Sequence, residues 1–187
     1  MGLYLLAILP IEEVAQEVIQ WKKHMAETYN ASYGLKVLPH ITLKQPFTID
    51  DSFIPSLVNE LNQFGKQESP FTITLNGFGF FTGKRSDVIY VKISESSALQ
   101  VFYAKLANFL NSQTNHLLHL DPPNSYAPHM TIAYRDLSTE NRKKAWTEFE
   151  QLDYIRTLTI NEFYLLKHDG RQWRKHTAIK LKGEPCD

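Results

Sequence analysis

The chain has few of the features that mark secreted or membrane-bound proteins. It contains one cysteine, Cys186, so no disulfide can form within the chain, which is typical of a reducing compartment. It has no run of about 18 apolar residues, and we therefore expect no transmembrane helix. The apolar residues 3–9 lack a preceding basic segment and a following small-residue cleavage site, so we do not interpret them as a signal peptide. These absences favour a cytoplasmic protein that does not bind membranes.

An excess of charge of either sign is also missing. Lys and Arg number 20, Asp and Glu number 20, and the formal net charge is zero. Proteins that hold extended nucleic acid along its phosphates usually present a broad basic surface, and we expect no such binding here. A small site for one nucleotide or one RNA end remains compatible with this composition. The length of 187 residues suits one domain over residues 1–187, and we expect a monomer.

One short pattern occurs twice and dominates the rest. Residues 39–43 read Pro-His-Ile-Thr-Leu, and residues 128–132 read Pro-His-Met-Thr-Ile. In an extended strand, successive side chains point to opposite faces. The histidine and threonine of each copy therefore share one face, and the two apolar residues share the other. We predict two strands that bury their apolar faces and turn the polar faces into one cleft.

Hydrophobic periodicity predicts the element order β-α-β-α-β-β-α-β-α-β-β. The helix after the first repeated strand should begin after the capping residues 50–52 and end at Gly65. Residues 30–38 indicate a loop in which we expect Gly34 to adopt an unusual backbone angle, a freedom that glycine has. We expect strands at 3–9, 40–48, 71–81, 88–93, 129–135, 154–167 and 172–182, and further helices at 11–28, 97–112 and 139–151.

The two repeated strands lie about half the chain apart, and each is followed by a helix and then a predicted hairpin. This order predicts an α+β fold that is bilobal and duplicated. Two mainly antiparallel sheets would flank a central cleft, with helices on the outside and a pseudo-twofold axis between the lobes. No low-complexity linker divides the chain, which favours one compact unit.

The paired histidines and threonines suit the cleavage of a phosphodiester. In-line displacement at phosphorus needs one group to take a proton from the attacking oxygen and another to give one to the leaving oxygen. Histidine can do either near neutral pH, since its unperturbed pKa is about 6.5. A threonine hydroxyl can donate to a non-bridging phosphate oxygen, where negative charge is held. Such a mechanism requires neither a metal nor another cofactor.

Residues 39–43 and 128–132 together resemble the twin His-x-Thr motifs of the 2H phosphoesterase superfamily, which includes bacterial 2'-5' RNA ligase-like proteins and cyclic phosphodiesterases. The resemblance extends over nearly the whole chain. It implies metal-independent action on 2',3'-cyclic or 2',5'-linked nucleotide phosphodiesters, with ATP-independent RNA ligation as the reverse reaction. It also implies that His40 and His129 are the acid and base, and that Thr42 and Thr131 hold the phosphate.

Other residues are candidates for contact with the substrate. Lys44 and Arg135 match loosely the basic or aromatic residue that many members of the superfamily carry shortly after a motif; the alternative is that both are simple surface charges. Aromatic side chains can stack on a base, and Tyr126, just before the second motif, is the first choice for this role. The segments 30–38, 77–87 and 111–127 should decide substrate choice. Further aromatic candidates for the cleft rim are Tyr33, Phe47, Phe81 and Tyr90.

Two alternatives to the enzyme remain open. The cleft could hold a nucleotide or an RNA end without turning it over. Alternatively, His116, His119 and Asp121 could form a metal site for a hydrolase, although their spacing matches no common zinc signature. We expect the remaining histidines to have surface or packing roles: His24, His168 and His176.

Overall fold

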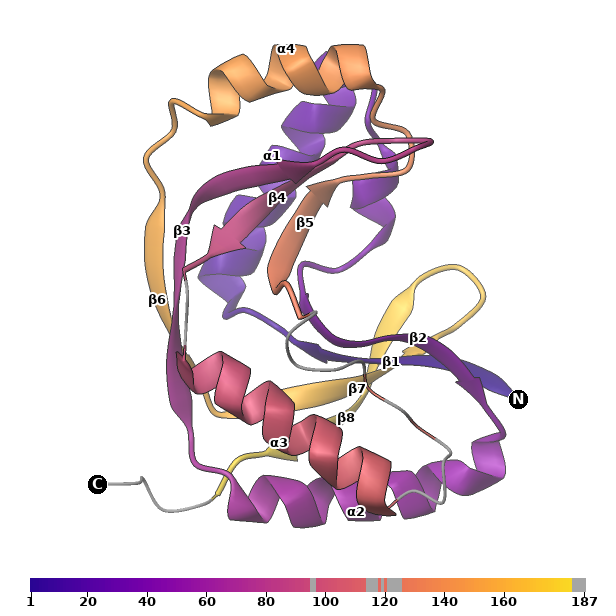
Figure 1. Cartoon of the computed structure of the whole chain (residues 1–187). Helices are drawn as coiled ribbons and strands as arrows, with labels where there is room; N and C mark the ends of the chain where they lie inside the picture. The colour runs from indigo at the N-terminus through magenta and orange to yellow at the C-terminus, as the bar shows by residue number, and fades with distance from the viewer. Residues whose placement is uncertain (95–96, 114–117, 119, 121–125, 183–187) are drawn as a thin grey trace.

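The computed structural model describes residues 1–94, 97–113, 118, 120 and 126–182. The elements follow one another as expected, except that the chain has one more strand than predicted (Figure 1). The strands are β1 (Gly2–Ile8), β2 (Ile41–Ile49), β3 (Phe71–Phe81), β4 (Val88–Ile93), β5 (His129–Ala133), β6 (Ile155–Ile160), β7 (Glu162–His168) and β8 (Trp173–Lys180). The helices are α1 (Glu12–Tyr29), α2 (Ile54–Gln67), α3 (Ser97–Gln113) and α4 (Thr139–Phe149), and two 3-10 turns are η1 (Tyr33–Lys36) and η2 (Asp51–Phe53).

All eight strands belong to one antiparallel sheet in the order β6-β3-β4-β5-β2-β1-β7-β8. The α+β fold class is therefore confirmed. The two predicted sheets are two runs of four strands, β6-β3-β4-β5 and β2-β1-β7-β8. They are joined where Ile41 of β2 pairs with Met130 of β5. Figure 1 shows that the two runs point in different directions, so the sheet curls.

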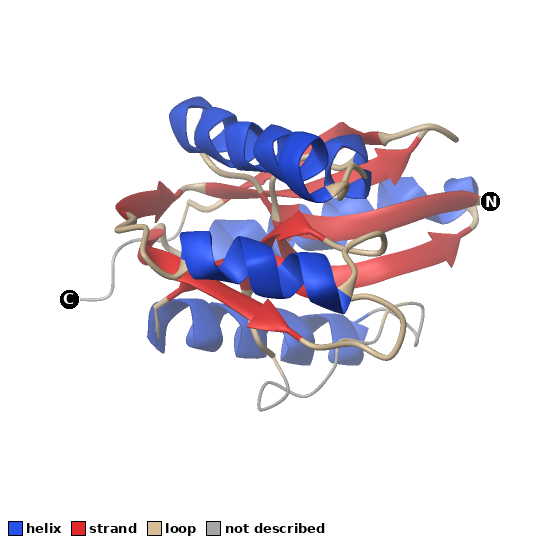
Figure 2. Ribbon diagram, turned by 90° about the horizontal axis from the view of Figure 1, so that it is seen from above, coloured by secondary structure: helices blue, strands red, loops and turns tan. Residues whose placement is uncertain are grey.

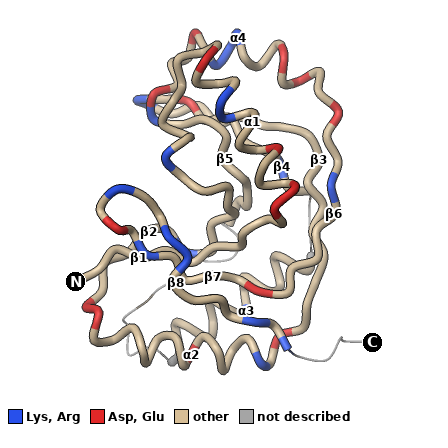
Figure 3. Tube along the Cα trace, turned by 180° about the vertical axis from the view of Figure 1, so that it is seen from behind, with Lys and Arg blue, Asp and Glu red and all other residues tan. Residues whose placement is uncertain are grey.

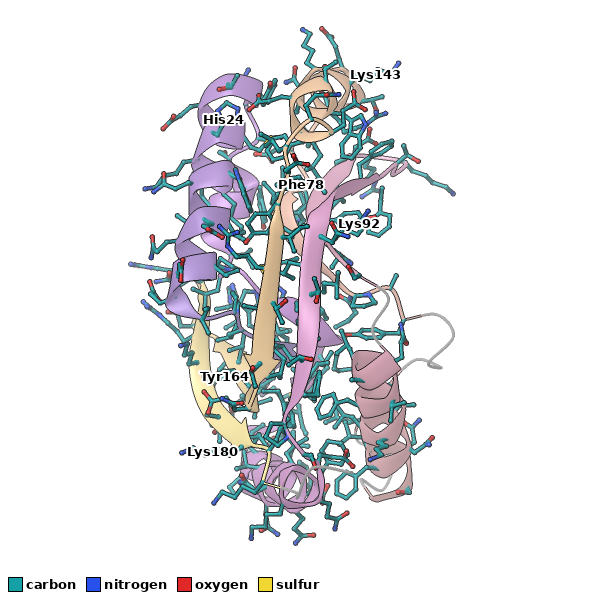
Figure 4. The ribbon with its side chains drawn as sticks, turned by 90° about the vertical axis from the view of Figure 1, so that its left-hand side faces the viewer. His24, Phe78, Lys92, Lys143, Tyr164 and Lys180 are labelled. Carbon is teal, nitrogen blue, oxygen red and sulfur yellow. The ribbon has the colours of Figure 1, made fainter. Side chains whose placement is uncertain are left out.

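The helices pack on the outside of this curled sheet (Figure 2). Helix α1 contacts β5 and α4 at one end of the molecule, whereas α2 contacts β8 and α3 at the other end. Amphipathic patterning explains these contacts, since each helix buries an apolar stripe. Phe78 of β3, labelled in Figure 4, lies between the strands and α1, where its ring meets Trp21 edge-on at 4.9 Å. None of the described helices is long and apolar enough to cross a membrane.

Two predicted boundaries are wrong. The segment expected as one strand over 154–167 is two strands, β6 and β7, which separate at Asn161 and join different runs of the sheet. Helix α2 continues past Gly65 to Gln67. Gly65 does not end the helix, but lets it approach β8. A Cβ at this position would lie 2.6 Å from the carbonyl oxygen of Lys180, too close for any residue except glycine.

Candidate active site

The two repeated stretches lie side by side at the centre of the sheet. Because Ile41 pairs with Met130 in antiparallel register, continuing that register sets Thr42 opposite His129 and His40 opposite Thr131. The alternation predicted from sequence is observed, since Ile41 and Met130 are fully buried while the histidines and threonines are half-buried. The fold thus brings all four polar residues to one face.

The two histidine rings are held in the same way. His40 Nδ1 lies 2.7 Å from the carbonyl oxygen of Leu38, and His129 Nδ1 lies 2.8 Å from that of Ala127. A carbonyl oxygen only accepts hydrogen bonds, so each Nδ1 carries a proton and donates it. The other ring nitrogen, Nε2, is left in both residues to take up or release a proton. In each copy the accepting carbonyl belongs to the residue just before the motif proline.

All four motif residues line one cavity of about 570 Å³. This volume is in the range of sites for small organic ligands. Segments far apart in sequence form its walls: α1, η1, both motif strands, and the turn between β7 and β8. Lys22, Lys36, Arg135 and Arg171 contribute positive charge, and no Asp or Glu is found among the described residues that line it. A protein of zero net charge therefore concentrates cations around its two histidines.

A smaller cavity of about 230 Å³ adjoins the large one, and Thr42, Gln45 and His129 line both. Phe81, Tyr103 and Tyr126 give it aromatic walls, and Lys44 adds a cation. Tyr126 stacks flat on Tyr103 with ring centroids 3.7 Å apart, and its hydroxyl donates to the carbonyl oxygen of Thr42 at 3.1 Å. Burial raises the pKa of Tyr126, so this hydroxyl keeps its proton.

The surroundings lower the proton affinity of His40. Burial is the largest cause, and the charges of Lys22 and His129 add to it, so the pKa of His40 falls to about 4 despite the hydrogen bond to Leu38. Lys22 is 2% exposed and donates to the carbonyl oxygen of Val37 at 2.6 Å. Its own pKa is lowered to about 8 by burial, so it is still charged at neutral pH. His40 is therefore neutral under the same conditions, with Nε2 unprotonated.

The second motif has a neutral counterpart to Lys22. Val37 is three residues before His40, and Tyr126 is three residues before His129. The carbonyl oxygen of Tyr126 accepts from the amide of Gln100 on α3 at 3.4 Å, as that of Val37 accepts from Lys22 on α1. Gln100 is exposed and uncharged, whereas Lys22 is buried and charged. The two halves of the site are thus similar in geometry but different in charge.

The turn after the second motif is fixed to η1. Asp136 accepts hydrogen bonds from the backbone N–H groups of Ser32 and Tyr33, both at 2.8 Å. Arg135 has a positive φ of 68°, which is uncommon for a residue other than glycine. Its guanidinium group donates to the hydroxyl of Tyr33 and lies 4.6 Å from the centre of that ring. Arg135 is thereby held at the cavity wall.

The other sequence candidates lie in different places. Tyr33 lines the large cavity and Phe81 the small one, as expected for rim residues. Tyr90 packs beside His129 at 5.2 Å between ring centres, and Phe47, half-buried, stacks on the core residue Tyr4. His168 packs edge-on against Trp173 at 5.1 Å between ring centres, as expected for a packing role, and it also lines the large cavity. His24 and His176 line neither cavity.

The suggested metal cluster cannot be placed, since His116, His119 and Asp121 lie outside the described residues. Within the part of the chain that is described, no three His, Cys, Asp or Glu side chains are grouped so as to hold a metal ion. Sequence reasoning missed several residues that line the large cavity: Lys22, Lys36, Gln45, Tyr134, Arg171 and Trp173. Only Lys22 left a signal, because it occupies the apolar stripe of α1 between Val18 and Met25.

Comparison with known families decides where the chain belongs. The family model of the 2'-5' RNA ligase superfamily matches residues 10–172. The chain is a member of the 2'-5' RNA ligase superfamily. Two similar proteins from Bacillus species are named as phosphoesterases. The protein of Bacillus mycoides (strain KBAB4) is 30% identical over 161 residues, which are 86% of this chain and 88% of that one. The protein of Bacillus cereus (strain AH820) is 29% identical over 158 residues, 84% and 86% of the two chains.

Solved structures show the same fold for this 2'-5' RNA ligase superfamily chain. A protein of Thermus thermophilus has a TM-score of 0.70 at 18% identity, covering 99% of this chain and all of that one (100%). LigT of E. coli in its apo form has a TM-score of 0.64 at 19% identity, covering 96% and 97%. LigT has also been crystallised with 3'-AMP, in a structure with a TM-score of 0.59 at 16% identity that covers 96% and 98%. Family and fold together place the chain among the 2H phosphoesterases.

Proposed function

We propose that this protein is a metal-independent phosphodiesterase that acts on 2',3'-cyclic or 2',5'-linked nucleotides through its two histidines. The observation that carries the proposal is the matched pair of rings. Each is fixed through Nδ1 to a backbone carbonyl, and both line the same cation-rich cavity. A phosphate placed between them would have one Nε2 atom on the side of the attacking oxygen and the other on the side of the leaving oxygen.

The neutral state of His40 favours a division of labour between the two histidines. His40, whose pKa is lowered to about 4, is neutral at pH 7 and takes a proton from the attacking water. His129 donates a proton to the leaving ribose oxygen. One P–O bond forms to the water oxygen and one P–O bond to the ribose breaks, so a phosphomonoester and a free hydroxyl result. Ligation without ATP starts from a cyclic phosphate and does not involve water: a 5'-hydroxyl attacks the 2',3'-cyclic phosphate, one P–O bond forms to its oxygen, and the P–O bond to the 3' oxygen breaks. This step is the reverse of attack by the 3'-hydroxyl on a 2',5' linkage, so the two histidines exchange their roles between the two directions.

Thr42 and Thr131 hold the phosphate in this scheme. Each projects on the same face as its histidine, and by the register each stands opposite the histidine of the other strand. Their hydroxyl groups donate to the non-bridging oxygens, where negative charge increases in the transition state. Lys44 and Tyr126 border the small cavity, and Arg135 borders the large one. We propose these three as substrate contacts outside the reacting group. LigT, whose fold the chain shares, has been crystallised with 3'-AMP and with ATP, which supports a small nucleotide substrate.

A product assay tests the proposal. The purified protein is incubated with a panel of 2',3'-cyclic and 2',5'-linked nucleotides, with and without EDTA. We expect turnover that EDTA does not abolish. We also expect His40→Ala and His129→Ala each to lower kcat roughly 10²–10⁴-fold, the usual range for loss of an acid or base. His176→Ala, on the exposed side of β8, is the matched control. Tight nucleotide binding without any product would instead support a binding module, and near-normal activity in either histidine variant would rule out the mechanism.

A further inference from the structure

The large cavity holds more positive charge than one phosphodiester needs. Two threonines and two histidines already surround the proposed position of the reacting phosphate. Lys22 is engaged with the carbonyl oxygen of Val37. Lys36, Arg135 and Arg171 remain, and all three line the same cavity.

Two of these cations lie around one aromatic ring. The guanidinium carbon of Arg135 is 4.6 Å from the centre of the Tyr33 ring, and Lys36 Nζ is 5.0 Å from it. The ring stabilises both charges, but it cannot neutralise them. The nearby carboxylate of Asp136 is directed to backbone N–H groups of η1 and does not line the cavity. Two like charges are thus kept close together, and no acidic side chain of the described residues faces the cavity beside them.

Arg171 belongs to the turn between β7 and β8, where Figure 3 shows basic and acidic residues together. The acid of this turn, Asp169, accepts from the backbone N–H of Arg171 at 2.8 Å and pairs with the side chain of Arg174 at 2.9 Å. The side chain of Arg171 is exposed and has no hydrogen bond or ion pair to any described residue. The turn is therefore fixed, while its arginine is free to bind a ligand.

We propose that Tyr33, Lys36, Arg135 and Arg171 form a second anion subsite, which binds a phosphoryl group of the substrate other than the one that reacts. This inference rests on the proposed function and narrows its substrate class to nucleotides with at least two phosphoryl groups. An anion at this position relieves the repulsion between the clustered cations and receives charge-assisted hydrogen bonds from them. The cavity of about 570 Å³ has room for more than the reacting phosphate.

Three substrates with the same base test the subsite. They are a nucleoside 2',3'-cyclic phosphate, the same compound with a 5'-phosphate, and a dinucleotide that ends in the cyclic phosphate and lacks a 5'-phosphate. We expect kcat/KM for the second or third to exceed that for the first by roughly 10-fold or more, the effect of one hydrogen bond to a charged group. The better of the two identifies the bound group as a phosphomonoester or as a neighbouring phosphodiester.

Two variants test whether Arg171 causes the preference for a second phosphoryl group. In Arg171→Gln the ratio of kcat/KM between phosphorylated and unphosphorylated substrate should fall towards one. It should be unchanged in Lys175→Gln, a cation of β8 that does not line the cavity. Equal kcat/KM for all three substrates, or a ratio that Arg171→Gln does not alter, would overturn the subsite and leave the proposed function intact.

If none of the three substrates is turned over, the proposed action on 2',3'-cyclic phosphates fails, and calorimetry decides the subsite by itself. The protein is titrated with adenosine 5'-phosphate and with adenosine. Tighter binding of the phosphorylated compound that is lost in Arg171→Gln supports the subsite. Equal binding of both compounds overturns it.

Discussion

At the scale of single residues, the two motif histidines have the same ring contact but different electrostatic surroundings. Each donates from Nδ1 to the carbonyl oxygen two residues earlier. Behind His40 lies the buried ammonium group of Lys22, whereas the corresponding position behind His129 is occupied by the neutral amide of Gln100. Burial and the charges of Lys22 and His129 together lower the pKa of His40 to about 4. A nearly symmetric pair of rings thus has unequal electrostatic surroundings, and these keep His40 neutral.

Replacing Lys22 by methionine should move the pH profile of the reaction. The folded-state pKa of His40 is below its ordinary value of about 6.5, so His40 is unprotonated and active as a base above about pH 4. Removing the positive charge raises this pKa, although burial still keeps it below 6.5. We therefore expect the acidic limb of kcat/KM against pH to shift to higher pH in Lys22→Met. The same upward shift should appear when the His40 ring is titrated by NMR.

Gln100 of α3, the neutral counterpart of Lys22, supplies the control for the pH profile. Gln100→Met removes a similar hydrogen bond to a backbone carbonyl but no charge, and it should leave the acidic limb where it is. Lys22→Arg keeps the positive charge, so the folded variant should have its acidic limb of kcat/KM at the same pH as the wild type. An acidic limb that stays in place in Lys22→Met would show that Lys22 does not set the protonation of His40.

The residue pattern predicted the strand faces but not the charges around them. Alternation within residues 39–43 and 128–132 follows from strand geometry alone, and it was confirmed. The pKa of His40 depends on the charge of Lys22, which belongs to helix α1, and on burial by the whole fold. Neither can be read from the residues around His40. Lysine on an apolar helical stripe was a usable signal, because such a position must bury its ammonium group or reach a polar partner.

At the scale of elements, η1 reaches the site through a close contact between backbones. We predicted an unusual backbone angle for Gly34, but among the glycines that the structure describes, those with positive φ are Gly77 and Gly170. Gly34 is instead required by space, since a Cβ there would lie 2.2 Å from the carbonyl oxygen of Ile132. This contact seats η1 against β5 next to Thr131. It joins distant parts of the chain, so local sequence could not reveal it.

Gly34→Ala should therefore displace η1 from β5. Tyr33 and Lys36 would move with it, and both line the large cavity. We expect KM to rise and the free energy of unfolding to fall by about 1–3 kcal/mol, the usual cost of forcing extra atoms into a packed site. Enzyme kinetics and thermal unfolding of the same preparation measure the two effects.

Gly77→Ala is the control that distinguishes the effect of backbone strain on stability from the effect of a displaced η1 on substrate binding. Gly77 of β3 has φ 66°, a Cβ added to it would meet no atom within 4 Å, and it does not line either cavity. Gly77→Ala should cost about 1–2 kcal/mol through its left-handed backbone and leave KM unchanged. If Gly34→Ala also kept a normal KM, the position of η1 would not matter for substrate binding.

The order of elements was predictable because most strands and helices carry a clear period, whereas two boundaries were not. The segment 154–167 has the pattern of a continuous strand, and only pairing with distant strands divides it at Asn161. There β6 pairs with β3, and β7 pairs with β1 and β8. Similarly, Gly65 has the local character of a helix end, but its contact with Lys180 keeps it inside α2. Tertiary contacts overrode local preference in both cases.

At the scale of the whole molecule, the two runs of strands do not correspond to the two halves of the sequence. The run β2-β1-β7-β8 combines the first and last strands of the chain, and the run β6-β3-β4-β5 comes from the middle. A single hydrophobic cluster includes buried residues of both runs, from Tyr4 and Ile41 to Ile73 and Phe163. We therefore propose that residues 1–187 form one cooperative domain, as expected from the sequence.

One buried ion pair fixes the far end of this domain. Asp87 ends the connection between β3 and β4, is 1% exposed, and accepts from Arg142 Nε of α4 at 3.0 Å. Burial by itself raises the pKa of Asp87, but the hydrogen bonds from the Gly83 N–H group and from Arg142 outweigh it, so the pKa is lowered. A carboxylate with a depressed folded-state pKa contributes stability above its unfolded pKa of about 3.9, and this stability is lost as the pH falls through the folded value.

Arg142→Met leaves the Asp87 carboxylate buried without its cation, and it should lower the free energy of unfolding by about 3–5 kcal/mol at pH 7. Because the main hydrophobic cluster spans both runs of strands, we expect the whole domain to unfold in one step at a lower temperature, with equal calorimetric and van't Hoff enthalpies. Asp87→Asn combined with Arg142→Met removes the unpaired charge and should recover part of the loss.

The Arg142→Met variant should also lose less stability than the wild type as the pH falls from about 5 to the acid limit, since the ion pair is already gone. Two separate transitions, with only one sensitive to Arg142→Met, would contradict the single domain and would mean that the two runs of strands unfold independently.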